Sequence, residues 1–191
     1  MCIRDSTITV TENSGTANNV TINNSGQISA GASSSGATSN NAIRSEDDTD
    51  NVTVVNNVGG HIQNNNTSST ALNAATVFIA ANSSATLTNS GTIENKGGVE
   101  NYAIGLAGDG VTMTLKDDGK VIGKISVAGG STTAHTIKLQ HGVGQAYFYD
   151  IDGSGTYTLQ DLDGNPVVKG SAGSIGQGLS LIHISEPTRP Y

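Results

Sequence analysis

The residues whose types and spacing come closest to a chemical site lie between Asp150 and Asp161. Oxygen-bearing side chains stand at positions one, three, five and twelve of this stretch, namely Asp150, Asp152, Ser154 and Asp161, and Gly155 is at position six. An EF-hand loop wraps Ca²⁺ in this order. Position twelve is Asp instead of a bidentate Glu, and neither flank has a helical pattern. A hairpin turn is therefore the favoured interpretation, and a weak Ca²⁺ site is the alternative.

Two other sets of ionisable residues are candidates for a catalytic or metal-binding role. The acidic run from Glu46 to Asp50 has the carboxylates that a glycoside hydrolase uses as acid and base, but its place at a turn favours a solvated loop. The histidines have no partner at a metal-ligand spacing, so we expect scattered surface positions for His61, His135 and His141. No G-x-S-x-G motif frames a serine. We therefore predict no catalytic residue, no cofactor-binding residue and no cofactor.

The chain contains four copies of one sequence repeat. Each copy has an apolar-Thr-apolar stretch, a turn rich in Asn or Asp that is closed by Gly, and one more apolar residue; the copies span Asn19–Ile28, Asn51–Ile62, Ala85–Ile93 and Val111–Val121. The closing glycines are 28 to 34 residues apart, at Gly26, Gly60, Gly91 and Gly119. Repeats of this length are typical of a solenoid.

Each copy has the pattern of a half-buried strand. In Val52-Thr53-Val54 the apolar residues are two apart and face one side, while the Thr faces the other. We expect the following Asn/Asp-Gly pair to form a left-handed or tight turn. A second apolar run comes later in each unit, as at Val77–Ile79, which gives about three short strands per unit. Stacked units should place Val54, Leu87 and Met113 in one interior column.

Composition limits the class of protein. Aromatic residues make up 4% and charged residues 13% of the 191 residues, and Asn, Ser, Thr and Gly dominate, which fits extended β structure better than a mixed α/β enzyme. The net charge of −7 disfavours nucleic acid as a partner. No stretch approaches the roughly 20 apolar residues of a membrane helix. Residues 71–81 have some helical propensity, but their place in the repeat favours strand.

The pattern loosens after Val127, so we divide the chain into repeats at 7–128 and a β-rich end at 129–178. Residues 145–151 and 156–159 hold most of the aromatic side chains and are joined by Asp152-Gly153-Ser154-Gly155. This arrangement predicts a β-hairpin. Aromatic residues at the end of a solenoid indicate a cap-like region.

Both ends resemble translations of a transposase-type sequencing adapter. Met1–Ser6 and Leu179–Arg189 carry this resemblance, and we leave residues 1–6 and 179–191 out of the fold prediction. The natural piece is then expected to run from Thr7 to Gly178 and to be part of a longer protein. It has no cysteine, which fits either a chain threaded unfolded across a membrane or simply a bacterial protein without cysteine.

The repeats resemble the passenger region of bacterial autotransporters. The resemblance rests on Asn89–Ile93, its variant Asn24–Ile28 and the closing Leu162–Val168. It implies an all-β, right-handed parallel β-helix of about four to five coils, exported through the outer membrane by a C-terminal β-barrel that this fragment lacks. The expected location is extracellular, at the cell surface, with membrane association only through that barrel.

Three functions remain open. The first is a non-enzymatic stalk or adhesin that binds a host-cell or matrix surface, a glycan or another copy of itself through its polar inserts at 31–41 and 63–70. Ladders of Asn and Thr along stacked coils would support it. The second is a polysaccharide-active β-helix lyase or hydrolase, which needs carboxylates gathered in one groove. The third is a plain scaffold whose binding residues lie in sequence outside this fragment.

Overall fold

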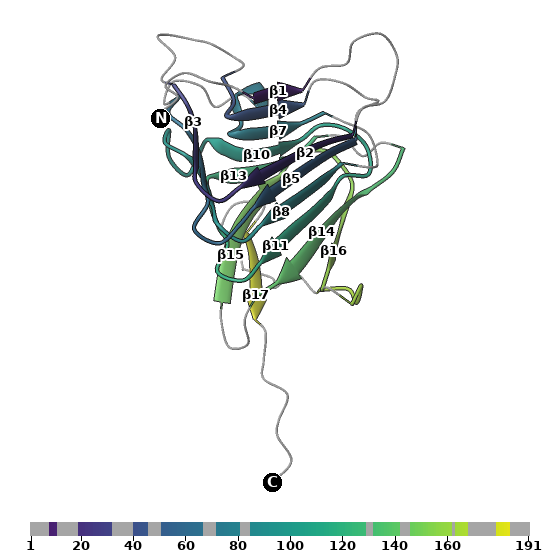
Figure 1. Cartoon of the computed structure of the whole chain (residues 1–191). Coiled ribbons are helices and arrows are strands. Elements are labelled where there is room, and N and C mark those ends of the chain that lie inside the picture. Colours follow the sequence, from purple (N-terminus) through teal and green to yellow (C-terminus); the bar gives the residue numbers. More distant parts are fainter. Residues whose placement is uncertain are drawn as a thin grey trace.

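The structure is a computed structural model that describes residues 8–10, 19–31, 40–45, 51–66, 72–80, 85–128, 132–141, 146–161, 163–167 and 179–183. Its strands form three sheets, which we call A, B and C (Figure 1). The only helical element among the described residues is a short 3₁₀ turn, η1 (Leu72–Ala74). The predictions of an all-β chain and of a strand at Val77–Ile79 are therefore confirmed.

Each sheet takes its strands in sequence order. Sheet A consists of β1 (Ile8–Val10), β4 (Ile43–Ser45), β7 (Val77–Ile79), β10 (Tyr102–Leu106), β13 (Lys124–Val127), β15 (Ala146–Asp152) and β17 (Leu179–His183). Sheet B consists of β2 (Asn19–Asn24), β5 (Asn51–Asn56), β8 (Thr86–Asn89), β11 (Thr112–Lys116), β14 (His135–Gln140) and β16 (Tyr157–Gln160). Sheet C consists of β3 (Gln27–Ala30), β6 (His61–Asn64), β9 (Thr92–Asn95) and β12 (Lys120–Ile122).

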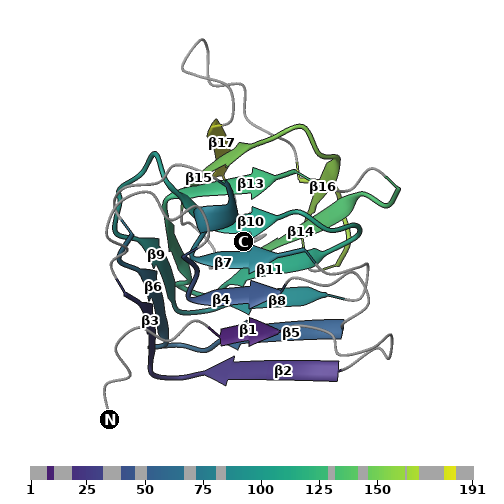
Figure 2. The same ribbon diagram turned by 90° about the horizontal axis from the view of Figure 1, so that it is seen from above.

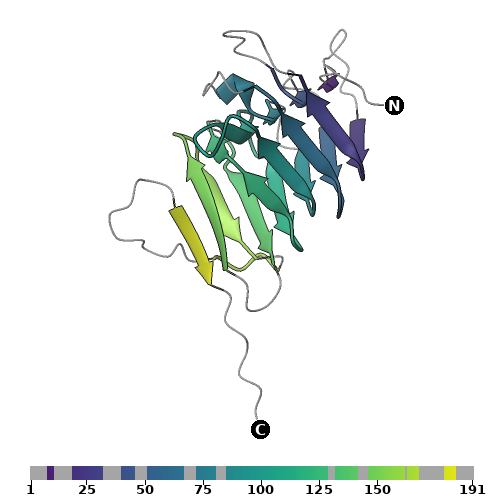
Figure 3. The same ribbon diagram turned by 90° about the vertical axis from the view of Figure 1, so that its left-hand side faces the viewer.

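The chain visits the three sheets in a fixed order. From β2 to β13 it runs through sheets B, C and A again and again, and we call one such passage a coil. Each strand pairs in parallel with the corresponding strand of the previous coil. Figure 2 shows sheet C on the side that connects sheets A and B, and Figure 3 shows the coils following one another in sequence order. Three parallel sheets visited in turn are consistent with a parallel β-helix.

The interior is built from columns of apolar side chains. One column of sheet B joins residues paired from coil to coil: Ile22, Val54, Leu87, Met113, Ile137 and Leu159. Val54, Leu87 and Met113 are each 0% exposed, so the predicted shared column is confirmed. Burial of one such side chain contributes about 1.5–3 kcal/mol, which a single coil cannot obtain alone.

Three of the four repeat glycines, Gly60, Gly91 and Gly119, permit close approach of the backbone and do not form a left-handed turn. The structure places positive φ at the neighbouring Gly59 (81°) and at Asp117 (55°), and Gly60, Gly91 and Gly119 do not have it. A Cβ on Gly91 would lie 2.2 Å from the carbonyl oxygen of Gly60 in the coil before. The expected left-handed conformation thus lies at Gly59, beside Gly60, and at Asp117, two residues before Gly119. Gly60, Gly91 and Gly119 themselves must be Gly because successive coils touch there.

Buried asparagines form a ladder at the same corner, between sheets B and C. Nδ2 of Asn24 donates to Oδ1 of Asn56 at 2.8 Å, and Nδ2 of Asn56 donates to Oδ1 of Asn89 at 2.8 Å. Nδ2 of Asn89 donates in turn to the carbonyl oxygen of Lys120 at 3.1 Å. Because each amide is both a donor and an acceptor, one residue type repeated in three successive coils can bond to itself along the axis.

The predicted β-hairpin near the C-terminal end is wrong. β15 pairs with β13 in sheet A and β16 pairs with β14 in sheet B, so the turn between them carries the chain from one sheet to the next. Gly153 in that turn has φ 115°, and a Cβ there would lie 2.2 Å from the carbonyl oxygen of Val127. A reversal occurs later, where Gln160 pairs antiparallel with Pro166. β17, in the adapter-like segment, pairs antiparallel with β15.

Candidate functional site

The four residues of the predicted calcium loop are divided between two sheets. Asp150 and Asp152 lie in β15 of sheet A, Ser154 lies in the exposed turn after it, and Asp161 follows β16 in sheet B. The Asp161 carboxylate accepts hydrogen bonds from Nδ2 and the backbone N–H of Asn165 at 2.9 and 2.8 Å, which lower its pKa. The chain does not wrap around one point there. In the described part of the chain, no three His, Cys, Asp or Glu side chains are grouped to hold a metal ion.

Asp150 and Asp152 instead join a polar cluster on the outer face of sheet A. The register places Tyr102 of β10 beside Lys124 of β13, and the pairing of β13 with β15 continues this row to Asp150. The Tyr102 hydroxyl donates to Oδ2 of Asp152 at 3.1 Å, and Nζ of Lys124 lies 2.7 Å from Oε2 of Glu100. We call these five residues the sheet-A cluster.

The sheet-A cluster shifts the pKa of three of its members. Partial burial raises the pKa of the Tyr102 phenol, and the Asp152 carboxylate adds to this effect. Burial also raises the pKa of Asp150, which Lys124 partly opposes. The hydrogen bond to Glu100 raises the pKa of Lys124. The cluster thus places a cation, carboxylates and a phenol together, so it presents both hydrogen-bond donors and acceptors.

One acceptor of the cluster has no partner. Oδ1 of Asp152 is buried and makes no hydrogen bond to any described residue. A buried carboxylate oxygen in this situation is costly unless a donor reaches it. Sequence reasoning missed the cluster, because Tyr102 and Asp152 are 50 residues apart and only the register of three sheet-A strands brings them together. The sequence signal was a polar residue at the start of two successive sheet-A strands, at Tyr102 and Lys124.

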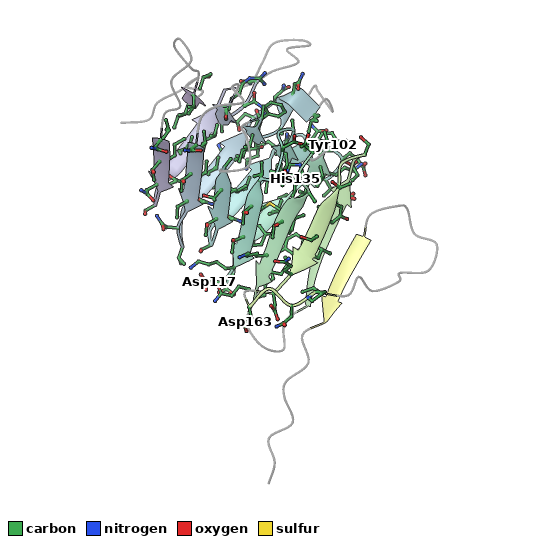
Figure 4. All side chains as sticks on the ribbon, turned by 90° about the vertical axis from the view of Figure 1, so that its right-hand side faces the viewer. Tyr102, Asp117, His135 and Asp163 are labelled. Carbon is green, nitrogen blue, oxygen red and sulfur yellow. The ribbon has the colours of Figure 1, made fainter. Side chains whose placement is uncertain are left out.

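The prediction of surface histidines is correct only for His61. Its Nε2 lies 3.0 Å from Oε2 of Glu94 on the outer face of sheet C. His135 is 0% exposed, and its Nδ1 accepts from the N–H of Val111 at 3.2 Å. His141 is also buried. The prediction was wrong for these two because β14 places His135 in an interior column, and His141, directly after β14, is also buried. Figure 4 labels His135 and Tyr102 at one end of the view, and Asp117 and Asp163 at the other.

The outer face of sheet B carries a ladder of threonines. Successive coils align them in register: Thr21, Thr53, Thr86, Thr112, Thr136 and Thr158. Parallel strands place neighbouring rungs about 4.8 Å apart. The hydroxyl of Thr86 donates to that of Thr53 at 3.3 Å. This row is polar and uncharged over its whole length.

Other predicted features fall outside the described residues. These are the acidic run at 46–50 and parts of the inserts, at 32–39 and 67–70. Gln63 and Asn64, predicted to begin the second insert, instead belong to β6. Among the residues that are described, no helix has the length and apolar character to cross a membrane.

Comparison with known proteins gives no match. No family model matches the chain, and neither a curated protein nor a solved structure does. Function is therefore argued from the chain's own geometry.

Proposed function

We propose that this chain is part of the passenger of an exported bacterial autotransporter and acts at the cell surface as a β-helical stalk or adhesin. In this proposal the β-helix is right-handed, with about four to five coils. Residues 7–128 supply its repeats and residues 129–178 its β-rich end. The proposed membrane anchor is the C-terminal β-barrel that the resemblance to autotransporter passengers implies.

The observation that carries the proposal is the pair of side-chain ladders. The buried Asn ladder and the outer Thr ladder repeat one residue type in successive coils, so that each coil offers the next the same contacts. Such nearest-neighbour repetition suits an element that is extended by adding coils, as a stalk must be. The row of threonines is itself uncharged, so it offers hydroxyl groups without charge repulsion to a contacting surface.

The experiment is a display assay with the whole chain. The chain is fused to an unrelated outer-membrane anchor in a non-adherent bacterium, and adhesion to cultured host cells, matrix proteins and immobilised glycans is measured. An adhesin gives binding above the anchor alone, whereas a stalk gives none but holds a fused reporter far from the membrane. If the chain does not bind and the fused reporter lies close to the membrane, both roles are contradicted.

One observation favours the alternative, a polysaccharide-active β-helix enzyme. Asp150 and Asp152 are two residues apart on one face of β15, which separates their Cα atoms by about 6.6 Å along the strand. Inverting glycosidases use a pair of carboxylates as acid and base, and the raised pKa of Asp150 suits a general acid. Release of reducing ends or unsaturated products from a polysaccharide panel, lost in Asp150→Asn, would favour this alternative over the stalk.

A further inference from the structure

His141 and Tyr149 form a buried pair in the last described part of the core. His141 follows β14 of sheet B and is 8% exposed, and Tyr149 belongs to β15 of sheet A and is 4% exposed. Sheet C has no strand beside them among the described residues, since its order ends at β12, one coil earlier. Their side chains therefore link sheets A and B directly, one coil beyond the last described strand of sheet C.

The neighbours of His141 define its protonation state. Nδ1 lies 3.0 Å from the carbonyl oxygen of Asp117, and Nε2 lies 2.7 Å from the hydroxyl oxygen of Tyr149. A carbonyl oxygen only accepts, so Nδ1 carries the proton and the neutral Nε2 accepts from the Tyr149 hydroxyl. The two rings are stacked, with centroids 5.7 Å apart and planes 25° from parallel.

We propose that His141 and Tyr149 act as an acid-sensitive latch that closes this end of the core. At neutral pH the latch joins β15 to the corner formed by β14 and the turn after β11. When His141 takes up a proton, Nε2 becomes a donor, so its bond with Tyr149 must reverse and the phenol oxygen must accept. A charge also appears inside the core, which is the larger cost. β15 then detaches locally while the earlier coils remain folded, because each coil contacts only its neighbours.

The charges around His141 determine the direction of the pH effect. Burial lowers the pKa of His141, and the Asp117 and Asp118 carboxylates, in the turn after β11, oppose this more weakly. Nζ of Lys116 lies 3.7 Å from Oδ2 of Asp117 and offsets part of that carboxylate's attraction. Because the folded pKa is below the unfolded value of about 6.5, the latch is fully stabilising above that pH. Its contribution is lost as the pH falls towards the folded pKa.

Hydrogen exchange of the full chain, followed by mass spectrometry at pH 7.5 and 5, tests the latch. After correction for intrinsic exchange, protection of β15 should fall on acidification relative to β5, by up to about tenfold for each pH unit between about 6.5 and the folded pKa. His141→Gln keeps a donor for Asp117 and an acceptor for Tyr149 but takes up no proton, so its β15 protection should not respond to acid. His61→Gln, at the outer histidine, should respond as the wild type does.

Equal acid responses in the wild type and His141→Gln would overturn the proposal. If His141→Gln does not fold, Tyr149→Phe provides the second measurement. It removes the donor to Nε2, so the pKa of His141 measured by NMR should rise towards about 6.5. An unchanged His141 pKa in Tyr149→Phe, or an ordinary one in the wild type, would also refute the latch.

Discussion

Replacing Asn56 with alanine should destabilise the chain far more than the same change at its neighbour Asn57. Asn56 is 0% exposed and stands in the middle of the ladder, where its Oδ1 accepts from Asn24 and its Nδ2 donates to Asn89, both at 2.8 Å. The side chain of Asn57 points outward and donates to the hydroxyl of Ser25 at 3.0 Å in an exposed contact. The two changes remove the same atoms from opposite sides of one strand end.

The expected difference follows from the groups left behind. Asn56→Ala leaves the Asn24 amide without its acceptor and Oδ1 of Asn89 without its donor, and each unsatisfied buried group costs about 1–3 kcal/mol. Nδ2 of Asn24 keeps a contact of 3.2 Å with the carbonyl oxygen of Gly26, which reduces the first cost. We therefore expect a loss of about 2–4 kcal/mol for Asn56→Ala and at most about 0.5 kcal/mol for Asn57→Ala.

Urea unfolding of the two variants and the wild type, followed by far-ultraviolet circular dichroism, measures this difference. The dependence on urea should be the same in all three, so that midpoints report stability. Asn56→Leu extends the test, because it removes the hydrogen bonds but keeps the volume and should still be destabilised. Equal midpoints for Asn56→Ala and Asn57→Ala, or a stabilised Asn56→Leu, would refute the idea that the ladder holds successive coils together.

Two further predictions concern the coil contacts and the sheet-A cluster. Gly91→Ala would place a Cβ 2.2 Å from the Gly60 carbonyl oxygen and should lower the free energy of unfolding by about 1–3 kcal/mol. The Cβ of Gly26→Ala meets nothing within 4 Å, so this variant should change the free energy of unfolding by less than about 0.5 kcal/mol. Equal urea midpoints for the two variants would contradict this difference. Asp152→Asn should lower the raised pKa of Tyr102 by removing the charge beside the phenol, although burial will hold that pKa above the ordinary value. Spectrophotometric titration, with Tyr102→Phe as the reference, measures the pKa of Tyr102. An unshifted pKa would show that Asp152 does not act on the phenol.

The repeats were predictable because each carries its own local signal. Alternation in Val52-Thr53-Val54 determines which side chains face inward, and the recurring Gly fixes how copies align, so the column through Leu87 and Met113 followed from spacing alone. The reason for the glycines did not follow. The contact between Gly91 and the preceding coil depends on the distance between stacked coils, and the sequence of one repeat does not determine that distance.

The end of the chain was less predictable because its signals fit more than one fold. Asp152-Gly153-Ser154-Gly155 has the composition of a hairpin turn, but the same residues also suit a corner between two sheets. Pairing with the preceding coil decides between them, since β15 and β16 each find a parallel partner already in place. The sheet-A cluster and the His141–Tyr149 pair arise from the same pairing and were invisible for that reason.

The Asn ladder ends at Asn89, and its hydrogen bonds show how the last amide is satisfied. Hydrogen bonds run in one direction along it, each amide donating to the next coil, and Asn89 donates to the backbone carbonyl of Lys120 instead of to a further side chain. The next residues in that column are Leu115 and Leu139, both buried. Asn56 makes the corresponding backbone bond, to the carbonyl oxygen of Thr92 at 3.1 Å, in addition to its bond to Asn89. Where Leu115 takes the next position, only the backbone carbonyl remains as the acceptor for the last amide. The change from Asn to Leu therefore completes the polar network, and from that level on the corner is filled by apolar packing.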